Sequence, residues 1–139
     1  MPTITPFLWH DNTAEAALEL YSAAFPGAQF LNSGRLGGAD SQLTSAAIQL
    51  LNQQIILFNG GPDFKPTPAF SFTVSAESPE TIQHLWQVLG NGGSILMDLA
   101  EYPFAGLFGW TADRFGFNWQ LIQRDGPEQI TPSLMFINQ

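Results

Sequence analysis

The sequence predicts an α+β protein built from two tandem βαβββ modules. Two segments show helical periodicity, and each lies between one strand-like segment and three further ones. A stretch rich in glycine and proline, 59–68, separates two near-equal halves. Because the order strand, helix, three strands occurs twice, we expect two sheets, each with a helix on one face. The repeat is inferred from the periodicity of apolar residues and from the positions of glycine, proline and capping residues, and not from sequence identity between the halves.

The first half is expected to open with a strand over 3–9, which is rich in β-branched and aromatic residues. Asn12 is the predicted N-cap of a helix, and Pro26 with Gly27 ends it. The apolar face of this helix is spaced at helical intervals and consists of Ala14, Ala17, Leu18, Tyr21 and Phe25. Three strands follow, over 29–36, 43–51 and 54–58.

The second half repeats this order, beginning with an alternating strand over 69–75. Ser78 and Pro79 predict a helix start, and the apolar face that follows consists of Ile82, Leu85, Trp86 and Leu89. Gly90, Gly92 and Gly93 are expected to stop the helix. Three strands follow over 94–99, 107–113 and 117–124, the last two forming a hairpin around Asp113-Arg114-Phe115-Gly116.

These segments predict a single domain over 1–139. Its parts are a first module over about 1–60, a linker over 59–68 and a second module over 69–124. The remaining residues, 125–139, are too apolar for a free tail, and we expect them to dock on the domain or on a second subunit.

Composition excludes several function classes. A formal charge of -8 argues against a nucleic-acid partner, because binding phosphates requires a basic surface. The absence of cysteine excludes disulfides, thiolate zinc sites and a cysteine nucleophile. Neither a signal peptide nor a membrane-spanning segment is predicted, so the expected location is the cytoplasm and no membrane partner is expected.

Three segments carry a family-specific pattern: TPFLW with NTAEAA, LY and FPGA over 5–28, FNGGP with Phe64 over 58–64, and GWTADRFGFNWQ over 109–120. Together they resemble PhnB-like proteins, whose domain often bears the label 3-demethylubiquinone-9 3-methyltransferase. The resemblance covers nearly the whole chain, 3–123, and implies the vicinal oxygen chelate superfamily, with its glyoxalase/bleomycin resistance/dioxygenase-like fold of paired βαβββ modules forming a cup. A methyltransferase of the usual kind needs a doubly wound sheet and a glycine-rich loop, for which this chain has no room.

The resemblance also implies where a metal would bind in enzymes of the superfamily. Those positions fall near 5–6, 57–58, 69–70 and Gln120, and Gln120 is the one residue there that can ligate a metal. Because catalytic sites need about three protein ligands, we expect no metal cofactor. His10 and His84 are interpreted as solvated surface residues.

Other polar residues have alternative interpretations. Asp98 is either an acid at a sheet edge or facing the cup, or a strand-end residue in water. Asp113 is predicted to form the hairpin turn by accepting local backbone donors, and Arg114 is predicted to pair with Asp113 or another acid.

The candidate ligand-binding residues combine aromatic surface with a few polar groups, as small-molecule sites usually do: Trp9, Ser71, Asp98, Trp110, Asn118 and Gln120. They support a metal-free protein that binds a small molecule in the cup. Two alternatives are a divalent-metal-dependent lyase, isomerase or dioxygenase using Gln120 with Asp98 or His10, and an interaction module acting through a dimer interface. We also expect a homodimer.

Overall fold

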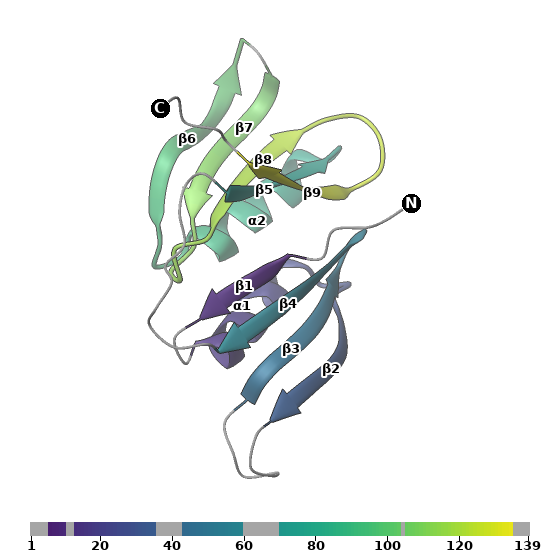
Figure 1. Cartoon of the computed structure of the whole chain (residues 1–139). Coiled ribbons are helices and arrows are strands. Elements are labelled where there is room, and N and C mark those ends of the chain that lie inside the picture. The colour runs from purple at the N-terminus through teal and green to yellow at the C-terminus, as the bar shows by residue number, and fades with distance from the viewer. Residues whose placement is uncertain (1–5, 11–12, 36–42, 60–69, 104, 135–139) are drawn as a thin grey trace. The chain divides into compact units, whose positions relative to one another are not determined.

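The computed structural model describes residues 6–10, 13–35, 43–59, 70–103 and 105–134. Contacts between Cα atoms divide the chain into two compact units, Met1–Lys65 and Pro66–Gln139. The described residues of each unit form one sheet and one helix, and each unit is described by itself (Figure 1).

The first unit consists of β1 (Phe7–His10), α1 (Ala14–Ala24), β2 (Gln29–Arg35), β3 (Leu43–Leu50) and β4 (Gln53–Asn59). Its sheet has the order β1-β4-β3-β2, with β1 and β4 parallel and the other pairs antiparallel. The helix packs on β3 and β4. The fully buried side chains between helix and sheet include Leu8, Ala17, Tyr21, Ile48, Ile55 and Leu57.

The second unit consists of β5 (Phe70–Ala76), α2 (Pro79–Gly90), β6 (Ser94–Tyr102), β7 (Ala105–Ala112), β8 (Asn118–Gln123) and β9 (Gln129–Leu134). Its sheet has the order β6-β7-β8-β5-β9, with β5 and β8 parallel. The helix packs on β5, β6, β7 and β8. Its core includes the tilted ring pair Phe72 and Trp119, whose centroids lie 4.8 Å apart, together with Ile82, Leu85, Leu89 and Leu121.

The two units share one topology, which confirms the predicted α+β fold of tandem βαβββ modules. In each, the first strand pairs in parallel with the fourth, and the second strand lies at the sheet edge. The second strand of each unit also contains a β-bulge. The pairing register shifts between Phe30 and Asn32 in β2 and between Ile95 and Met97 in β6. Such bulges bend an edge strand and make it a poor template for another strand.

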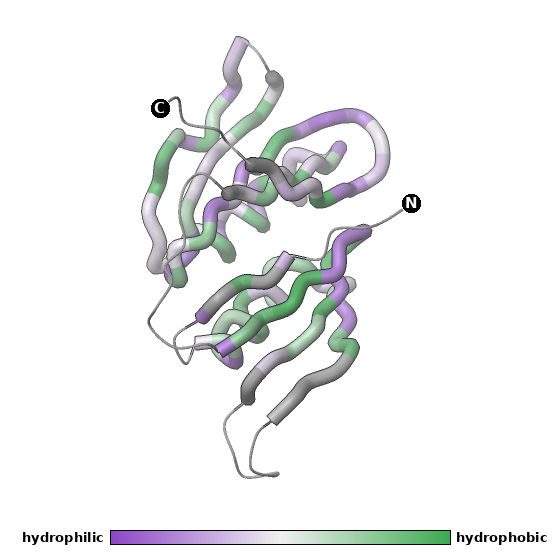
Figure 2. The backbone as a smooth tube through the Cα atoms, in the orientation of Figure 1, coloured by the Kyte–Doolittle hydropathy of each residue, from purple (hydrophilic) through white to green (hydrophobic). Residues whose placement is uncertain are grey.

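The tail contributes a strand that the sequence pattern did not predict. Residues 129–134 form β9, which pairs antiparallel with β5 and places Ile130 opposite Val74. Ile130 is buried within the unit, and Pro132 is acceptable because an edge strand has one side without ladder partners. Figure 2 shows that a hydrophilic loop joins β8 to this strand. Residues 135–139 lie outside the described part.

The helix N-termini differ in how they are capped. The residue at the N-cap of α1 is Thr13, and the predicted cap Asn12 lies outside the described residues. The N–H of Ala14 donates to Oδ1 of Asn59, 3.0 Å away at the end of β4. At the start of α2, Ser78 is the N-cap as predicted and Pro79 follows it, although the Ser78 side chain makes no cap bond.

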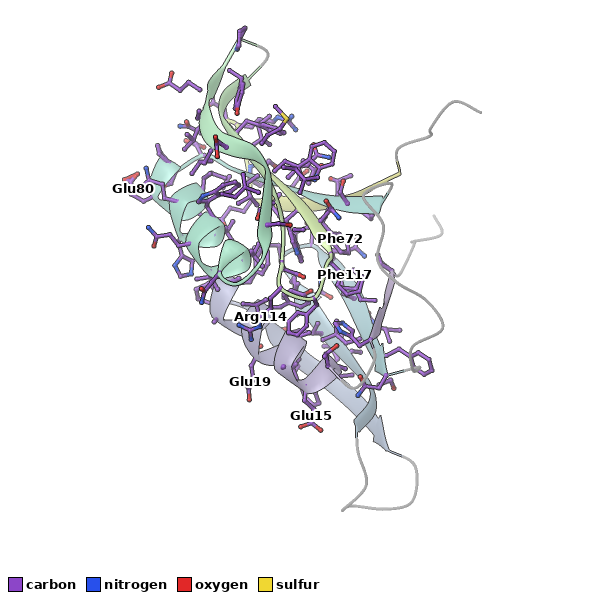
Figure 3. The ribbon with its side chains drawn as sticks, turned by 90° about the vertical axis from the view of Figure 1, so that its left-hand side faces the viewer. Glu15, Glu19, Phe72, Glu80, Arg114 and Phe117 are labelled. Carbon is purple, nitrogen blue, oxygen red and sulfur yellow. The ribbon has the colours of Figure 1, made fainter. Side chains whose placement is uncertain are left out.

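Both helices present acidic residues to solvent. Glu15 and Glu19 project outward from α1, and Glu80 does so from α2 (Figure 3). Within the described residues, neither helix has the length and apolar character that crossing a membrane requires.

Candidate functional site

Four of the predicted ligand-binding residues lie on one face of the second sheet. The strand register places Trp110 opposite Gln120, and Ser71 opposite Asn118. Side chains alternate between the faces of a strand. The opposite face therefore carries Trp119 and Leu121, which are fully buried on the side of α2. We call the face away from α2 the cup face.

Two hydrogen bonds join these four side chains in pairs. The indole N–H of Trp110 donates to Oδ1 of Asn118 over 3.0 Å, and Nε2 of Gln120 donates to Oγ of Ser71 over 3.0 Å. Asn118 in turn donates through Nδ2 to the carbonyl of Gly116. Ser71 and Asn118 are buried, whereas Trp110 and Gln120 are half-buried. The buried pair therefore fixes the orientation of the two more accessible side chains.

The cup face thus offers both an aromatic surface and an amide acceptor. The ring of Trp110 is held through its own N–H and is half-buried, and aromatic rings of this kind can stack on a flat ligand. Within the described residues, Gln120 is bonded through Nε2 and no hydrogen bond engages its Oε1. Met97 lies opposite Trp110 in the sheet register, and Thr73 lies opposite Gln120.

The other two candidates lie elsewhere in the sequence of elements, on β6 of the same unit and on β1 of the first unit. Asp98 is exposed on β6, an edge strand, and its backbone carbonyl accepts from the hydroxyl of Tyr102 over 2.7 Å. Trp9 belongs to β1 of the first unit, where its Cα pairs with that of Phe58, and its side chain lies outside the described atoms.

The hairpin between β7 and β8 is organised by Asp113, as predicted. Its Oδ1 accepts from the backbone N–H groups of Phe115 and Phe117, over 2.9 and 3.1 Å. Its Oδ2 accepts from the indole N–H of Trp119 over 3.0 Å, a contact that the sequence did not indicate. Gly116 closes the turn with a φ of 93°. Arg114 is exposed and places its guanidinium 5.1 Å from the centroid of the Phe115 ring.

The positions that the resemblance implies for metal ligands carry mainly apolar residues. Leu57 is fully buried in the core of the first unit, and Pro6 is buried before β1. Thr5 and Ala69 lie outside the described residues. Among those described, no group of three or more His, Cys, Asp or Glu side chains is placed to hold a metal ion.

The interpretation of His10 as a solvated residue was wrong, whereas His84 is exposed as expected. His10 is 2% exposed, because it ends β1 where α1 begins and its ring is enclosed at that junction. Its Nδ1 lies 2.7 Å from Oγ1 of Thr13. Burial disfavours the charged imidazolium and lowers the pKa of His10 from 6.5 to about 4.

The family model described as 3-demethylubiquinone-9 3-methyltransferase matches residues 2–122. The chain belongs to this family. A PhnB protein from Bacillus cereus that bears the same methyltransferase description shares 31% sequence identity with it, with a TM-score of 0.81 over 88% of this chain and 100% of that one.

Two further comparisons extend this relationship. An uncharacterised protein of Mycobacterium tuberculosis H37Rv is 26% identical over 130 residues, covering 88% of this chain and 74% of its own length. A glyoxalase/bleomycin resistance protein from Albidiferax ferrireducens shares the fold at 15% identity, with a TM-score of 0.60 over 87% of this chain and 98% of that one. The PhnB-like chain therefore has the fold of the glyoxalase/bleomycin resistance superfamily.

The methyltransferase description of the family is not matched by the geometry of this PhnB-like chain. Methyltransferases of the usual kind bind their nucleotide-like cofactor at a glycine-rich loop that follows the first strand of a doubly wound parallel sheet. Here each sheet has one parallel pair among antiparallel strands. The connections from β1 to α1 and from β5 to α2 contain no glycine. The described residues therefore do not fit that cofactor, and we derive no reaction step through it.

Sequence reasoning missed Thr73 and Met97 as members of the cup face. The alternation of the strand over 69–75 puts Thr73 on the same face as Ser71, which was a usable signal. The position of Met97 could not be predicted in this way. A bulge in β6 shifts the pairing with β7, and only this shift places Met97 opposite Trp110.

Proposed function

We propose that this PhnB-like protein binds a small, partly aromatic or apolar molecule on the cup face of its second unit, without a metal ion. One observation carries the proposal: Trp110 and Gln120 are adjacent, half-buried and held in place by buried Asn118 and Ser71. A preoriented aromatic ring beside an amide acceptor suits a ligand with a flat apolar body and one donor group.

The neighbouring side chains support an apolar preference. Met97 lies opposite Trp110, and Phe108 and Ile122 are paired farther along the same two strands. Thr73 adds a hydroxyl opposite Gln120. A molecule lying along β7 and β8 would therefore meet hydrocarbon at one end and amide and hydroxyl groups at the other.

A thermal-shift screen of small aromatic and apolar compounds tests this proposal, because a ligand of the folded state raises the melting temperature. The dissociation constants of the compounds found are then measured for Trp110→Leu, Trp110→Phe and Gln120→Leu. We expect Trp110→Leu and Gln120→Leu to weaken binding about tenfold, which corresponds to about 1.4 kcal/mol. Trp110→Phe retains an aromatic face and should weaken it less.

The matched control is Gln83→Leu, which makes the same chemical change on the exposed surface of α2. It should leave every dissociation constant unchanged. Unaltered binding in both Trp110→Leu and Gln120→Leu would remove the cup face as the binding site.

We also propose that the protein forms a homodimer. The tail is a weaker candidate contact than expected, because Ile130 is already buried within its own unit. The exposed large apolar side chains of the described residues lie instead in the edge strands β2 and β6, and are Phe30, Leu31, Ile95 and Leu96.

Light scattering at micromolar concentration should give twice the mass of 15.2 kDa. A double substitution of Phe30→Ser and Leu31→Ser should shift the mass toward the monomer if β2 forms the contact. A monomeric mass for the unaltered chain refutes the dimer.

A further inference from the structure

A pocket lies on the opposite side of the second sheet from the cup face. It has a volume of about 290 Å³ and opens beside the last turn of α2. Its lining consists of Trp86, Gln87, Gly90, Asn91, Ile95 and Thr111, and we call it the α2 pocket. Thr111 lies opposite Trp119 in the register and points to the helix side, whereas the neighbouring Trp110 belongs to the cup face.

The walls of the α2 pocket are fixed by backbone contacts. Trp86 packs against Gly109 so closely that a Cβ at that glycine would lie 2.6 Å from Cζ3 of the indole. Thr111 donates through Oγ1 to the carbonyl of Ser94 over 2.8 Å and so anchors the start of β6. The N–H of Gly93 donates to the carbonyl of Gly90 over 3.0 Å and closes the turn between them. These contacts hold three of the six lining residues in place, namely Trp86, Gly90 and Thr111.

Its apolar part consists of an indole and a branched aliphatic side chain. Trp86 is half-buried, and Ile95 is 59% exposed although it is a large apolar residue. These two side chains suit a flat hydrocarbon body.

The polar part of the pocket favours hydrogen-bond donors and positive charge. None of the six lining residues is charged, and α2 has no basic residue in its last turn. The end of a helix leaves backbone carbonyls without helical partners and carries a partial negative charge. The indole of Trp86 adds a further attraction for a cation. Arg114 lies beside Gly92, but it holds its guanidinium over the ring of Phe115 and is not part of the lining.

We propose that the α2 pocket is a separate binding site for a small aromatic amine in its ammonium form. The aromatic body lies against Trp86 and Ile95, and the ammonium group donates to backbone carbonyl oxygens at the end of α2 and to the side-chain amide oxygens of Gln87 and Asn91. This site shares no residue with the cup face, so the two can be tested independently.

Three indole compounds of similar size and different charge test the proposal: tryptamine, indole-3-ethanol and indole-3-acetate. Titrations by calorimetry at pH 7 should give the tightest binding for tryptamine, at least tenfold weaker binding for the alcohol, and none for the acetate. Equal binding of all three, or no binding of tryptamine at millimolar concentration, would overturn the proposal.

The variant Asn91→Lys places a positive charge inside the pocket and should weaken tryptamine binding at least tenfold. It should not unfold the protein, because a cation at a helix C-terminus is favourable. Gln83→Lys, at an exposed position of α2 outside the lining, makes the same change of charge and should bind tryptamine as the unaltered chain does.

Trp110→Leu should also leave tryptamine binding unchanged. Loss of binding in Trp110→Leu but not in Asn91→Lys would assign tryptamine to the cup face and refute the α2 pocket.

Discussion

Asp113 joins the hairpin turn to the core through three hydrogen bonds. Its two oxygens accept from two backbone N–H groups and from the indole of Trp119, and the residue is 2% exposed. A carboxylate suits this position because all three partners are donors. The same residue therefore shapes the turn locally and fixes the largest fully buried side chain of its unit.

We predict that Asp113→Asn lowers the free energy of unfolding by about 2 kcal/mol, because one oxygen becomes an NH₂ group facing a donor. Urea unfolding followed by fluorescence measures the loss. Asp98→Asn, the same change at an exposed site of β6, should alter stability by less than about 0.5 kcal/mol. Equal losses in the two variants would show that the contacts of Asp113 are not responsible.

His10 couples the stability of the first unit to pH. Its pKa is lowered to about 4 by burial, whereas the unfolded chain has the ordinary value of 6.5. Between these values the unfolded state binds more protons, so stability falls as the pH falls through this window. Well above pH 6.5 the imidazole is neutral in both states and imposes no penalty.

We predict that His10→Asn flattens the dependence of stability on pH between 6.5 and 4. Asn retains a polar atom near Thr13 but does not titrate, so up to about 3 kcal/mol of acid destabilisation should disappear. Unfolding free energies at several pH values in this range provide the measurement, and exposed His84→Asn is the control. Parallel curves for His10→Asn and the unaltered chain would contradict the prediction.

At the scale of the residue, the sequence predicted which face of a strand a side chain lies on better than it predicted whether a side chain is buried. The alternation of β8 correctly separated Asn118 and Gln120 from Trp119, because it depends on local geometry alone. The burial of His10 could not be read from sequence, since it depends on α1 and β4 meeting at the end of β1. The bond from Gln120 to Ser71 likewise required the register of two distant strands.

Among the structural elements, the turn from α2 to β6 depends on a close backbone approach. A Cβ at Gly93 would lie 1.9 Å from the carbonyl oxygen of Ala112, which belongs to β7. The sequence indicated that this glycine stops the helix, but the structure shows that it also lets β7 pass beside the turn. Gly92, with a φ of 80°, supplies the left-handed backbone there.

We predict that Gly93→Ala destabilises the protein by about 2 kcal/mol or more, because a backbone atom cannot move aside as a flexible side chain can. Gly27→Ala is the control, since a Cβ there meets nothing within 4 Å. It should be neutral or gain about 0.5 kcal/mol by restricting the unfolded chain. Thermal and urea unfolding of both variants measure the difference, and equal stabilities would refute the role of Gly93.

Helices and inner strands were predicted within a few residues, because apolar periodicity is strong where one face packs on a core. The ends of β6 were less predictable. It runs to Tyr102 rather than Leu99, since Glu101 and Tyr102 still pair with β7 and the ring of Tyr102 meets that of Phe108 edge-on at 5.9 Å. β9 was missed as a strand because Pro132 and a preceding polar loop obscure the alternation that its pairing with β5 imposes.

At the scale of the whole molecule, acidic residues outnumber basic ones by twelve to four. Glu15, Glu19 and Glu80 are exposed on the helices. Mutual repulsion among such charges favours the expanded chain and is screened by salt.

We therefore predict that the melting temperature at pH 7 rises by several degrees when NaCl is increased from about 0.02 M to about 0.5 M. Differential scanning fluorimetry measures the shift. A choline chloride series serves as the control for a specific effect of sodium. A melting temperature that falls in both salts would contradict the dominance of repulsion.

The order strand, helix, three strands was predicted correctly in both halves, although β9 follows it in the second half. Glycine, proline and capping residues mark most boundaries between elements locally. The sequence also carried the family pattern over 109–120, which coincides with the hairpin that builds the cup face. The sequence did not predict which side chains the register of distant strands brings together on that face, such as Gln120 and Ser71.

The capping of α1 by Asn59 bears on the order in which the two halves acquire structure. The first N–H of α1 receives its acceptor from a residue 45 positions later in the chain, so that bond forms only after β4 has been placed. In α2 the corresponding position is Pro79, which has no N–H to satisfy and is preorganised for a helix. Helix formation in the second half is thus a local event, whereas α1 is completed by the last strand of its own half. Folding kinetics should accordingly show α2 ordered before α1, although α1 is synthesised first.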